Sequence, residues 1–429
     1  IIKPFDLIYG KYFSPFFSLS DIEFAWSKNG LEKIGGTQNL FFRIDYLLVE
    51  RDLPLDISQI SSSERSKQIH CSFRVFLRTM TIKWEEEVEK RLLNYMSHSS
   101  TTGNEAKFAE VVAKDLEDNG WTVQKQFIPG TDRFNVYASF RNSDPKYVKV
   151  LLNTHLDTVP PYFPPTQDDK NIYGNGSNDA KGQLAAMVTA ATIISNTDED
   201  VARALGLLFV VGEELDHVGM IEANKLGILP DYLLVGEPTE LKFGTIQKGA
   251  LKVKLTVTGQ AGHSGYPDSG TSAIHKMVEV LNDVLKFEWP SDKTYGSTTL
   301  NVGKIAGGQA LNAWAAQCDA DIFFRVVTSV KNIEELLNKV VDGRAEVTLL
   351  SSNDPVILDV PPIEAETDQV SFNTDIAYFD AKDKVKAKYL FGGGSIKNAH
   401  SKNEFIPKDE LHKCTSTLVK LVHNLYSYH

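Results

Sequence analysis

Several short segments place His, Asp or Glu directly after an apolar run or at the start of a helical pattern. The first is His155-Leu156-Asp157, which follows the apolar residues 148–152, and side chains two apart on an extended chain point to the same side. Further segments of this kind carry Asp179, Glu213-Glu214, Glu237 and His400. Two histidines with several carboxylates are a donor set that suits a hard-to-borderline divalent cation such as zinc.

Taken singly, each of these residues has an ordinary structural explanation. Asp179 precedes a helical pattern and is a typical helix N-cap, while Glu213-Glu214 is typical of a solvated loop or a helix start. Together, however, they follow separate apolar strands, and ligands bind at the carboxyl ends of the strands in open α/β sheets. We therefore expect these segments to converge at one edge of one sheet.

The periodicity of apolar residues from position 84 onward predicts alternating helices and strands. Helices are expected at 84–98, 105–119 and 183–194, and strands at 122–127, 134–140, 148–152, 204–211 and 232–235. Strand and glycine-loop signals resume at 387–394. This alternation predicts an α/β sheet covered by helices on both faces.

The pattern changes near Lys248. Strict alternation at 251–258 is typical of a half-buried antiparallel strand, and the order strand–helix–strand–strand–helix–strand continues to residue 350. We expect a large α/β domain interrupted by a smaller α+β domain. The predicted boundaries are 80–247 with 354–429 for the large domain, and 248–353 for the insertion.

Residues 1–79 differ from the rest of the chain. Residue 1 is Ile1, the first methionine is Met80, and the segment between them shows neither sustained periodicity nor a secretory signal. The segment is either a real extension or upstream sequence translated in frame, with Met80 as the true start, and its weak local pattern favours the second interpretation. Without a visible signal, we expect a cytoplasmic protein.

Composition excludes several classes of protein. The 429 residues are 42% hydrophobic with a net charge of -11, which fits a globular chain and argues against nucleic acid or an anionic membrane as partner. No apolar run approaches the roughly 20 residues of a membrane span. The scattered Cys71, Cys318 and Cys414 provide neither a disulfide framework nor a thiolate metal site. No G-x-G-x-x-G follows the first strand of the large domain, which argues against a dinucleotide-binding dehydrogenase.

The same segments resemble a known family. The sequences His155-Leu156-Asp157-Thr158-Val159-Pro160-Pro161, Gly212-Glu213-Glu214, Gly236-Glu237-Pro238-Thr239 and Ala261-Gly262-His263-Ser264-Gly265 are similar to motifs of the M20 family of metallopeptidases. The resemblance runs from about Trp84 to the carboxyl terminus. It extends to fungal enzymes named "probable carboxypeptidase", to acetylornithine deacetylase and to succinyl-diaminopimelate desuccinylase. The motifs are specific for the family and poorly specific for the substrate.

The resemblance implies two Zn²⁺ ions per chain, with Co²⁺ or Mn²⁺ as substitutes. His155 and Glu237 would bind one ion, Glu214 and His400 the other, and Asp179 would bridge them. It further implies that Asp157 orients His155, that Glu213 is the general base, and that His263 reaches the scissile carbonyl from the partner subunit of a homodimer. Three ligating carboxylates and one hydroxide neutralise two zinc ions, which leaves Glu213 free to act as a base.

Substrate contacts are less determined. Asn312 and Arg325 match positions that contact substrate in the desuccinylases, although Arg325 lies in an alternating strand and is also typical of a solvent-facing residue. Backbone N–H groups around Gly393, in the loop Gly392–Gly394, either bind a substrate carboxylate or form a plain turn. The segment between His155 and Asp179 is shorter than in the bacterial deacylases, so the rim of the cleft differs there.

Three functions remain open from the sequence. The first is a zinc exopeptidase that releases a C-terminal amino acid from a small peptide, and the second is an N-acyl amino acid deacylase. Both hydrolyse an amide beside a free carboxylate, so the metal ligands do not separate them. The third is a non-catalytic metal-binding protein, which the presence of Glu213 and all the ligands argues against.

Overall fold

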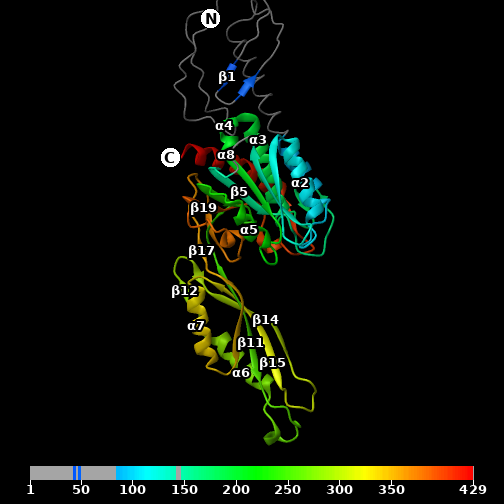
Figure 1. The fold of residues 1–429 in the computed structure, drawn as a ribbon, viewed down its shortest axis with the longest axis vertical. Coiled ribbons are helices and arrows are strands. Elements are labelled where there is room, and N and C mark those ends of the chain that lie inside the picture. The colour runs from blue at the N-terminus through cyan, green and yellow to red at the C-terminus, as the bar shows by residue number, and fades with distance from the viewer. Residues whose placement is uncertain (1–41, 45–46, 50–83, 142–145, 429) are drawn as a thin grey trace, which may run out of the picture.

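The computed structural model describes residues 42–44, 47–49, 84–141 and 146–428 (Figure 1). Most of 1–79 therefore lies outside the described residues, and the prediction about this segment lies there with it. Within it, β1 (Phe42–Ile44) pairs with β2 (Leu47–Val49) in an antiparallel ladder. In the part of the chain that the structure describes, no helix is long and apolar enough to cross a membrane.

The large domain is built around a six-stranded sheet in the order β19-β9-β5-β8-β4-β3. Its strands are β3 (Trp121–Phe127), β4 (Phe134–Phe140), β5 (Val150–His155), β8 (Leu205–Val210), β9 (Tyr232–Val235) and β19 (Ala387–Leu390). The four strands β19, β9, β5 and β8 are parallel, whereas β4 and β3 are antiparallel additions at one edge. The predicted α/β sheet is confirmed, as a mixed rather than a purely parallel one.

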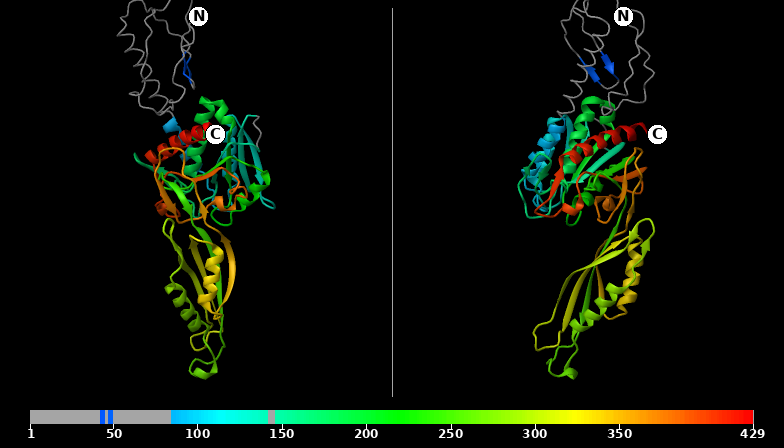
Figure 2. Two further views of the ribbon diagram at one scale, coloured as in Figure 1. Left: turned by 90° about the vertical axis from the view of Figure 1, so that its left-hand side faces the viewer. Right: turned by 180° about the vertical axis from the view of Figure 1, so that it is seen from behind.

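Helices cover both faces of this sheet, as expected (Figure 2). One face packs against the helix at 84–96 and against α2 (Ala106–Asp118), α3 (Lys181–Thr197) and α8 (Lys408–Ser427). The other face packs against α5 (Val218–Ala223) and the 3-10 helix η5 (Asp375–Tyr378). Adjacent residues of β5 face opposite ways, so Leu152 joins the first core and Leu151 the second.

The inserted domain has its own core, between Leu251 and Val347. Its four-stranded antiparallel sheet has the order β14-β15-β11-β16, and two helices pack on it, in the predicted order along the chain. The elements are β11 (Gly249–Thr258), α6 (Ala273–Lys286), β14 (Thr299–Gly307), β15 (Gln317–Val326), α7 (Val330–Val341) and β16 (Glu346–Asn353). This domain projects from the large one, and its loop after β11 lies at the far end (Figure 1).

Short elements connect and border the two domains. At the junction, β10 (Phe243–Gln247) lies between β17 (Val356–Ile357) and β18 (Thr367–Val370). The small strands β6 (Thr166–Gln167), β7 (Asn171–Tyr173) and β20 (Phe405–Pro407) form another sheet. The remaining short elements are α4 (Glu199–Arg203), η3 (Asn224–Leu226), η4 (Pro267–Ser269), β12 (Ser291–Asp292), β13 (Gly296–Ser297) and η6 (Ile396–Asn398).

Candidate active site

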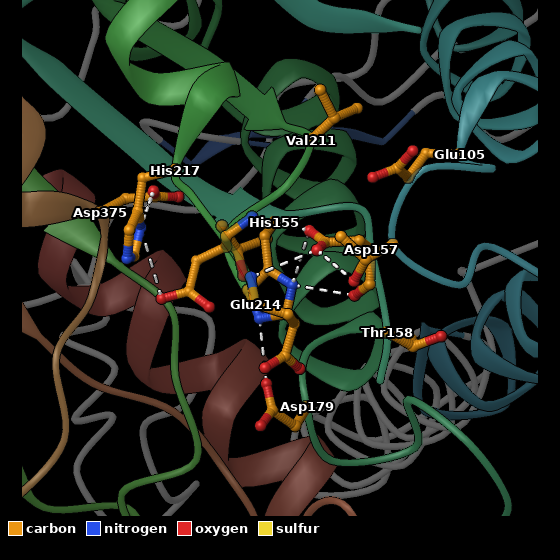
Figure 3. Close-up of polar contacts among 12 residues, drawn as sticks. Glu105, His155, Asp157, Thr158, Asp179, Val211, Glu214, His217 and Asp375 are labelled. Atoms are coloured by element: carbon orange, nitrogen blue, oxygen red, sulfur yellow. Dashed lines mark hydrogen bonds and ion pairs between the residues drawn. The ribbon is translucent and has the colours of Figure 1, made fainter. Parts of the chain in front are cut away.

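Parallel pairing of β5, β8 and β9 brings His155, Glu214 and Glu237 together at the carboxyl ends of these strands, and the loops that carry Asp179 and His400 meet them there. Figure 3 shows three of these residues, His155, Asp179 and Glu214, close together. His155 ends β5, and its Nε2 lies 3.0 Å from Asp179 Oδ1 and 3.8 Å from Glu237 Oε1. His400 Nε2 lies 3.2 Å from Asp179 Oδ2 and 3.0 Å from Glu214 Oε2. The two oxygens of Asp179 therefore face two different histidines, each of which has its own glutamate.

The pair Glu213-Glu214 is anchored by Asp157. The Asp157 carboxylate accepts the backbone N–H groups of Glu213 at 3.0 Å and Glu214 at 3.2 Å, and the Thr102 hydroxyl at 2.9 Å. Its distance to His155 Nδ1 is 3.5 Å, whereas the Asp157 carbonyl oxygen lies 2.9 Å from that nitrogen. Asp157 therefore contacts His155 mainly through its backbone, and its carboxylate fixes the turn after β8, a contact that sequence reasoning missed.

Burial and mutual repulsion govern the ionisation of the glutamates. Burial raises the pKa of Glu213 well above its usual value, and the charge of Glu237 raises it further. The pKa of Glu237 is also raised well above its usual value by burial, which the charge of His155 opposes. Burial and the charge of Asp179 raise the pKa of Glu214. The protein's own groups therefore compensate the negative charge of this site only in part.

The two histidines are the cationic partners of this site. Hydrogen bonds with Asp179 and Glu214 raise the pKa of His400 to about 10. Burial opposes the ionisation of Asp179, but hydrogen bonds from His155 and His400 lower its pKa below the usual range. Among the described residues, the ion pairs of Asp179, Glu214 and Glu237 all involve these histidines.

This donor set fits divalent cations. Donor atoms of His155, Asp179 and Glu214 lie within 4.8 Å of one another, a spacing that could hold a metal ion. Buried carboxylates are costly without cations close by, and an imidazole that loses its proton becomes a metal ligand. His400 and Glu237 extend the same cluster to either side.

Glu404 holds the loop that presents Asp179, and it was not found from the sequence. Its carboxylate accepts the backbone N–H groups of Gly176, Asn178 and Asp179, at 3.2, 3.0 and 3.0 Å. The loop also needs a positive φ of 81° at Gly176, which glycine adopts without strain. Glu404 lies four residues after His400, so this carboxylate connects the two segments of the cluster. Its position just after a candidate ligand was the available signal.

The inserted domain keeps two predicted residues away from this cluster. His263 lies in the loop after β11 and Asn312 in the loop after β14, and the two loops meet where the Ser264 N–H donates to the Asn312 carbonyl at 3.0 Å. The loop after β11 lies at the far end of the inserted domain (Figure 1). Arg325 lies on β15 nearer the junction, half-buried, with its guanidinium 4.1 Å from the centroid of the Phe323 ring. Burial lowers the pKa of Arg325, and the negative charge of Glu213 partly offsets this.

The contacts of the loop around Gly393 favour the second of its two interpretations, a plain turn. The Gly393 N–H donates to Gln183 Oε1 at 3.1 Å, and its neighbours Gly392 and Gly394 donate to Thr239 Oγ1 at 3.0 Å and Glu410 Oε2 at 2.8 Å. Every N–H group of this glycine loop therefore has an acceptor within the chain. The loop forms a packed turn rather than a carboxylate-binding site.

Comparison with sequences of known proteins agrees with these observations. Residues 245–347 match the peptidase dimerisation domain of the M20 family. The chain is 36% identical over 317 residues to a peptidase M20 domain-containing protein of Schizosaccharomyces pombe, covering 73% of this chain and 78% of that protein. It is 34% identical over 365 residues to a "probable carboxypeptidase" of Paracoccidioides brasiliensis, covering 75% and 82%.

Solved structures share the fold. A tripeptidase from Staphylococcus aureus superposes with a TM-score of 0.69 at 20% identity, covering 80% of this chain and 99% of that one. An M20 family metallo-carboxypeptidase from Sulfolobus solfataricus gives 0.65 at 17% identity, covering 78% and 99%. A dinuclear metal-binding M20 peptidase from Bacillus subtilis gives 0.61 at 11% identity, covering 81% and 99%. The fold and the sequence relatives together confirm the resemblance, and the chain belongs to the M20 family of metallopeptidases, which are hydrolases.

Proposed function

We propose that the protein is a two-zinc exopeptidase that releases the carboxyl-terminal amino acid of small peptides. The observation that carries this proposal is the arrangement around Asp179, whose two oxygens lie 3.0 and 3.2 Å from two different histidines. His155 with Glu237 forms one ligand set, and His400 with Glu214 forms the other. Relatives named "probable carboxypeptidase" and the dinuclear Bacillus subtilis peptidase support the same assignment.

Two bound divalent ions would supply an activated water molecule and polarise the scissile carbonyl. Glu213 would accept the proton of the attacking water, since its backbone N–H is held by Asp157 and, among the described residues, its ion pair is with His217 rather than with His155 or His400. Burial that raises the pKa of this carboxyl also makes it a stronger base, which can hold the proton and deliver it to the leaving amine. Asp157 keeps the base and the adjacent ligand Glu214 in a fixed relation.

The free carboxylate of the substrate needs a cation at the edge of the site. Arg325 is the candidate, because it is half-buried on β15 and its pKa responds to the charge of Glu213. An arginine fork binds a carboxylate through two parallel hydrogen bonds. Asn312 lies in a loop of the inserted domain. It would contact the substrate together with Arg325 only if that loop of an inserted domain came close to the metal ligands.

We propose that His263 acts across a homodimer. The matched dimerisation domain supports a second copy, and within one chain the loop after β11, which carries His263, lies at the end of the inserted domain away from the large domain (Figure 1). His263→Ala should lower kcat by about 10²–10³-fold, the usual loss on removing one oxyanion donor, with metal content unchanged. Mixing His263→Ala with Glu213→Gln should restore about a quarter of wild-type activity, since half of the dimers are mixed and each holds one intact site. No recovery after verified subunit exchange, or full activity of His263→Ala alone, would contradict the role.

A substrate screen on metal-analysed protein tests the proposed function. Protein purified without chelator should contain close to two zinc ions per chain and should hydrolyse N-blocked dipeptides with a free carboxyl terminus. Dipeptide amides are the matched control, because they lack the carboxylate and should be poor substrates. Hydrolysis of N-acetyl amino acids alone would assign the deacylase function instead, and activity that persists with no bound metal would reject the metal assignment.

A further inference from the structure

A second polar cluster lies beside Glu213, and the proposed mechanism does not use it. We call it the hinge cluster, and it consists of His217, Gln247, Asn353, Asn373, Asp375 and Tyr378. His217 and Asp375 point toward each other next to the ligands (Figure 3). The cluster joins three separate parts of the chain, namely the turn after β8, the domain junction and η5.

His217 occupies the centre of the hinge cluster. Its Nδ1 lies 3.0 Å from Asp375 Oδ1 and 3.8 Å from Glu213 Oε1. The ring stacks on Tyr378 with centroids 3.9 Å apart and an angle of 18° between the planes. On its other side, Nε2 lies 3.4 Å from Asn373 Nδ2. Because that amide nitrogen is a donor, Nε2 accepts and Nδ1 carries the proton, which it donates to Asp375 rather than to the more distant Glu213.

The orientation of the Asn373 amide is fixed by Gln247 and Asn353, the residues at the two points where the chain crosses between the domains. Its Oδ1 accepts Gln247 Nε2 at 2.9 Å and Asn353 Nδ2 at 2.8 Å. The Thr374 hydroxyl donates to Gln247 Oε1 at 2.5 Å, and the Tyr378 hydroxyl to Asn353 Oδ1 at 3.4 Å, so both amides are oriented as donors toward Asn373. The crossing residues therefore determine which nitrogen of the imidazole carries the proton.

Gln247 and Asn353 are the last residues of β10 and β16, where the chain enters and leaves the inserted domain. The two crossings are packed tightly, since a Cβ on Gly249 would come within 2.6 Å of both the Asn353 carbonyl oxygen and Pro355 N. Asn353 pairs within the sheet of the inserted domain, whereas Gln247 pairs with Val356 and Val370 at the junction. A rotation of the inserted domain would therefore move the Asn353 amide relative to Gln247 and Asn373. The displaced amide would shift Asn373, and with it the hydrogen bond between Asn373 Nδ2 and His217 Nε2.

We propose, on the basis of the proposed function in which Glu213 is the base, that His217 is a positioning residue for Glu213 and that the hinge cluster transmits the position of the inserted domain to it. Asp375 is only 1% exposed, so its carboxylate depends on a nearby donor. Without the His217 N–H, the carboxylates of Asp375 and Glu213 would face each other and repel. The imidazole thus separates the two carboxylates and keeps Glu213 directed at the ligand cluster.

Two substitutions at His217 test the donor. His217→Phe keeps the stacking on Tyr378 but removes both nitrogens, and kcat should fall about 10–100-fold, the usual effect of removing a group that orients a site residue. KM and zinc content should stay near wild type. His217→Asn places an amide N–H near the position of Nδ1 and should recover most of kcat. The matched control is His412→Phe, which also breaks a histidine–carboxylate pair, with Glu89 at 3.0 Å, and should leave kcat unchanged.

Asn373→Asp tests the connection to the hinge, and serves as the measurement if His217→Phe fails to fold. It keeps the acceptor for Gln247 and Asn353 but removes the donor to His217, so kcat should fall without loss of zinc. In a double-mutant cycle with His217→Phe the two losses should not add. Equal losses in His217→Phe and His217→Asn, or wild-type kcat in His217→Phe and Asn373→Asp, would overturn the inference. If Glu213→Gln keeps its activity, Glu213 is not the base. In that case the proposed function itself fails, and not only the role inferred for His217.

Discussion

Glu213→Gln is expected to lower kcat by about 10²–10⁴-fold, the contribution typical of a general base, while zinc content and Tm stay near wild type. Gln keeps the size of the side chain and its hydrogen bonding but cannot accept a proton. The backbone N–H of residue 213 still donates to Asp157, so the turn after β8 is unaffected. The measurements are kcat, elemental zinc and thermal unfolding on the same preparation.

Glu214→Gln is the matched comparison, because it makes the same chemical change one residue away. Glu214 lies 3.0 Å from His400 Nε2, so its loss should weaken one ion, and added zinc should partly restore activity. The two substitutions should therefore have different effects: Glu213→Gln should lower kcat, and Glu214→Gln should lower the affinity for zinc. Loss of zinc from Glu213→Gln with retention in Glu214→Gln would exchange the two roles.

The sequence predicted the convergence of the candidate ligands wherever a candidate residue ends or follows an apolar strand. His155 ends β5, Glu213 and Glu237 follow β8 and β9, and parallel pairing of those strands determines that they meet. The order of elements in the inserted domain was also predictable, because its strands alternate and its helices have one apolar face. Local periodicity is sufficient where one face of an element is buried.

The sequence did not predict contacts that depend on distant partners. Glu404 accepts three N–H groups from a loop more than 200 residues earlier, and His217 meets Asp375 across 158 positions. Nothing in the periodicity near these residues distinguishes them from ordinary polar loop residues. The helix α8 (Lys408–Ser427) was also not predicted, although its buried residues Leu411, Leu418 and Leu425 recur at helical spacing.

The sequence could not separate the two interpretations of the glycine loop for a related reason. Consecutive glycines offer backbone N–H groups, and the sequence alone does not reveal which acceptors are near. The structure supplies Thr239, Gln183 and Glu410 from other segments, so the loop is a point of close packing. At Gly392 a Cβ would lie 2.1 Å from Gln183 Oε1, which shows that glycine is required there for space rather than for ligand binding.

Asp179→Asn is expected to remove both metal ions and nearly all activity, because, among the residues that the structure describes, only Asp179 has ion pairs with both histidines, at 3.0 and 3.2 Å. An amide is a neutral and poorer ligand, and it cannot bridge two cations with two anionic oxygens. A site filled at about 1,000 times its Kd stabilises the fold by about 4 kcal/mol, and most of that metal-dependent stabilisation should be lost. The measurements are zinc content and Tm with and without added zinc.

The comparison with chelator-treated protein separates this effect from simple damage to the fold. Without metal, Asp179→Asn should unfold at a lower temperature than wild type, because it loses the ion pairs with His155 and His400, but added zinc should no longer raise its Tm. Asp115→Asn is the matched control: it breaks a pair with Arg91 at 2.8 Å far from the ligands, so it should lower Tm equally with and without zinc. An Asp179→Asn protein that retains two ions and the full zinc-dependent rise in Tm would show that Asp179 does not bridge, and the two-ion arrangement would then have to be built from the glutamates alone.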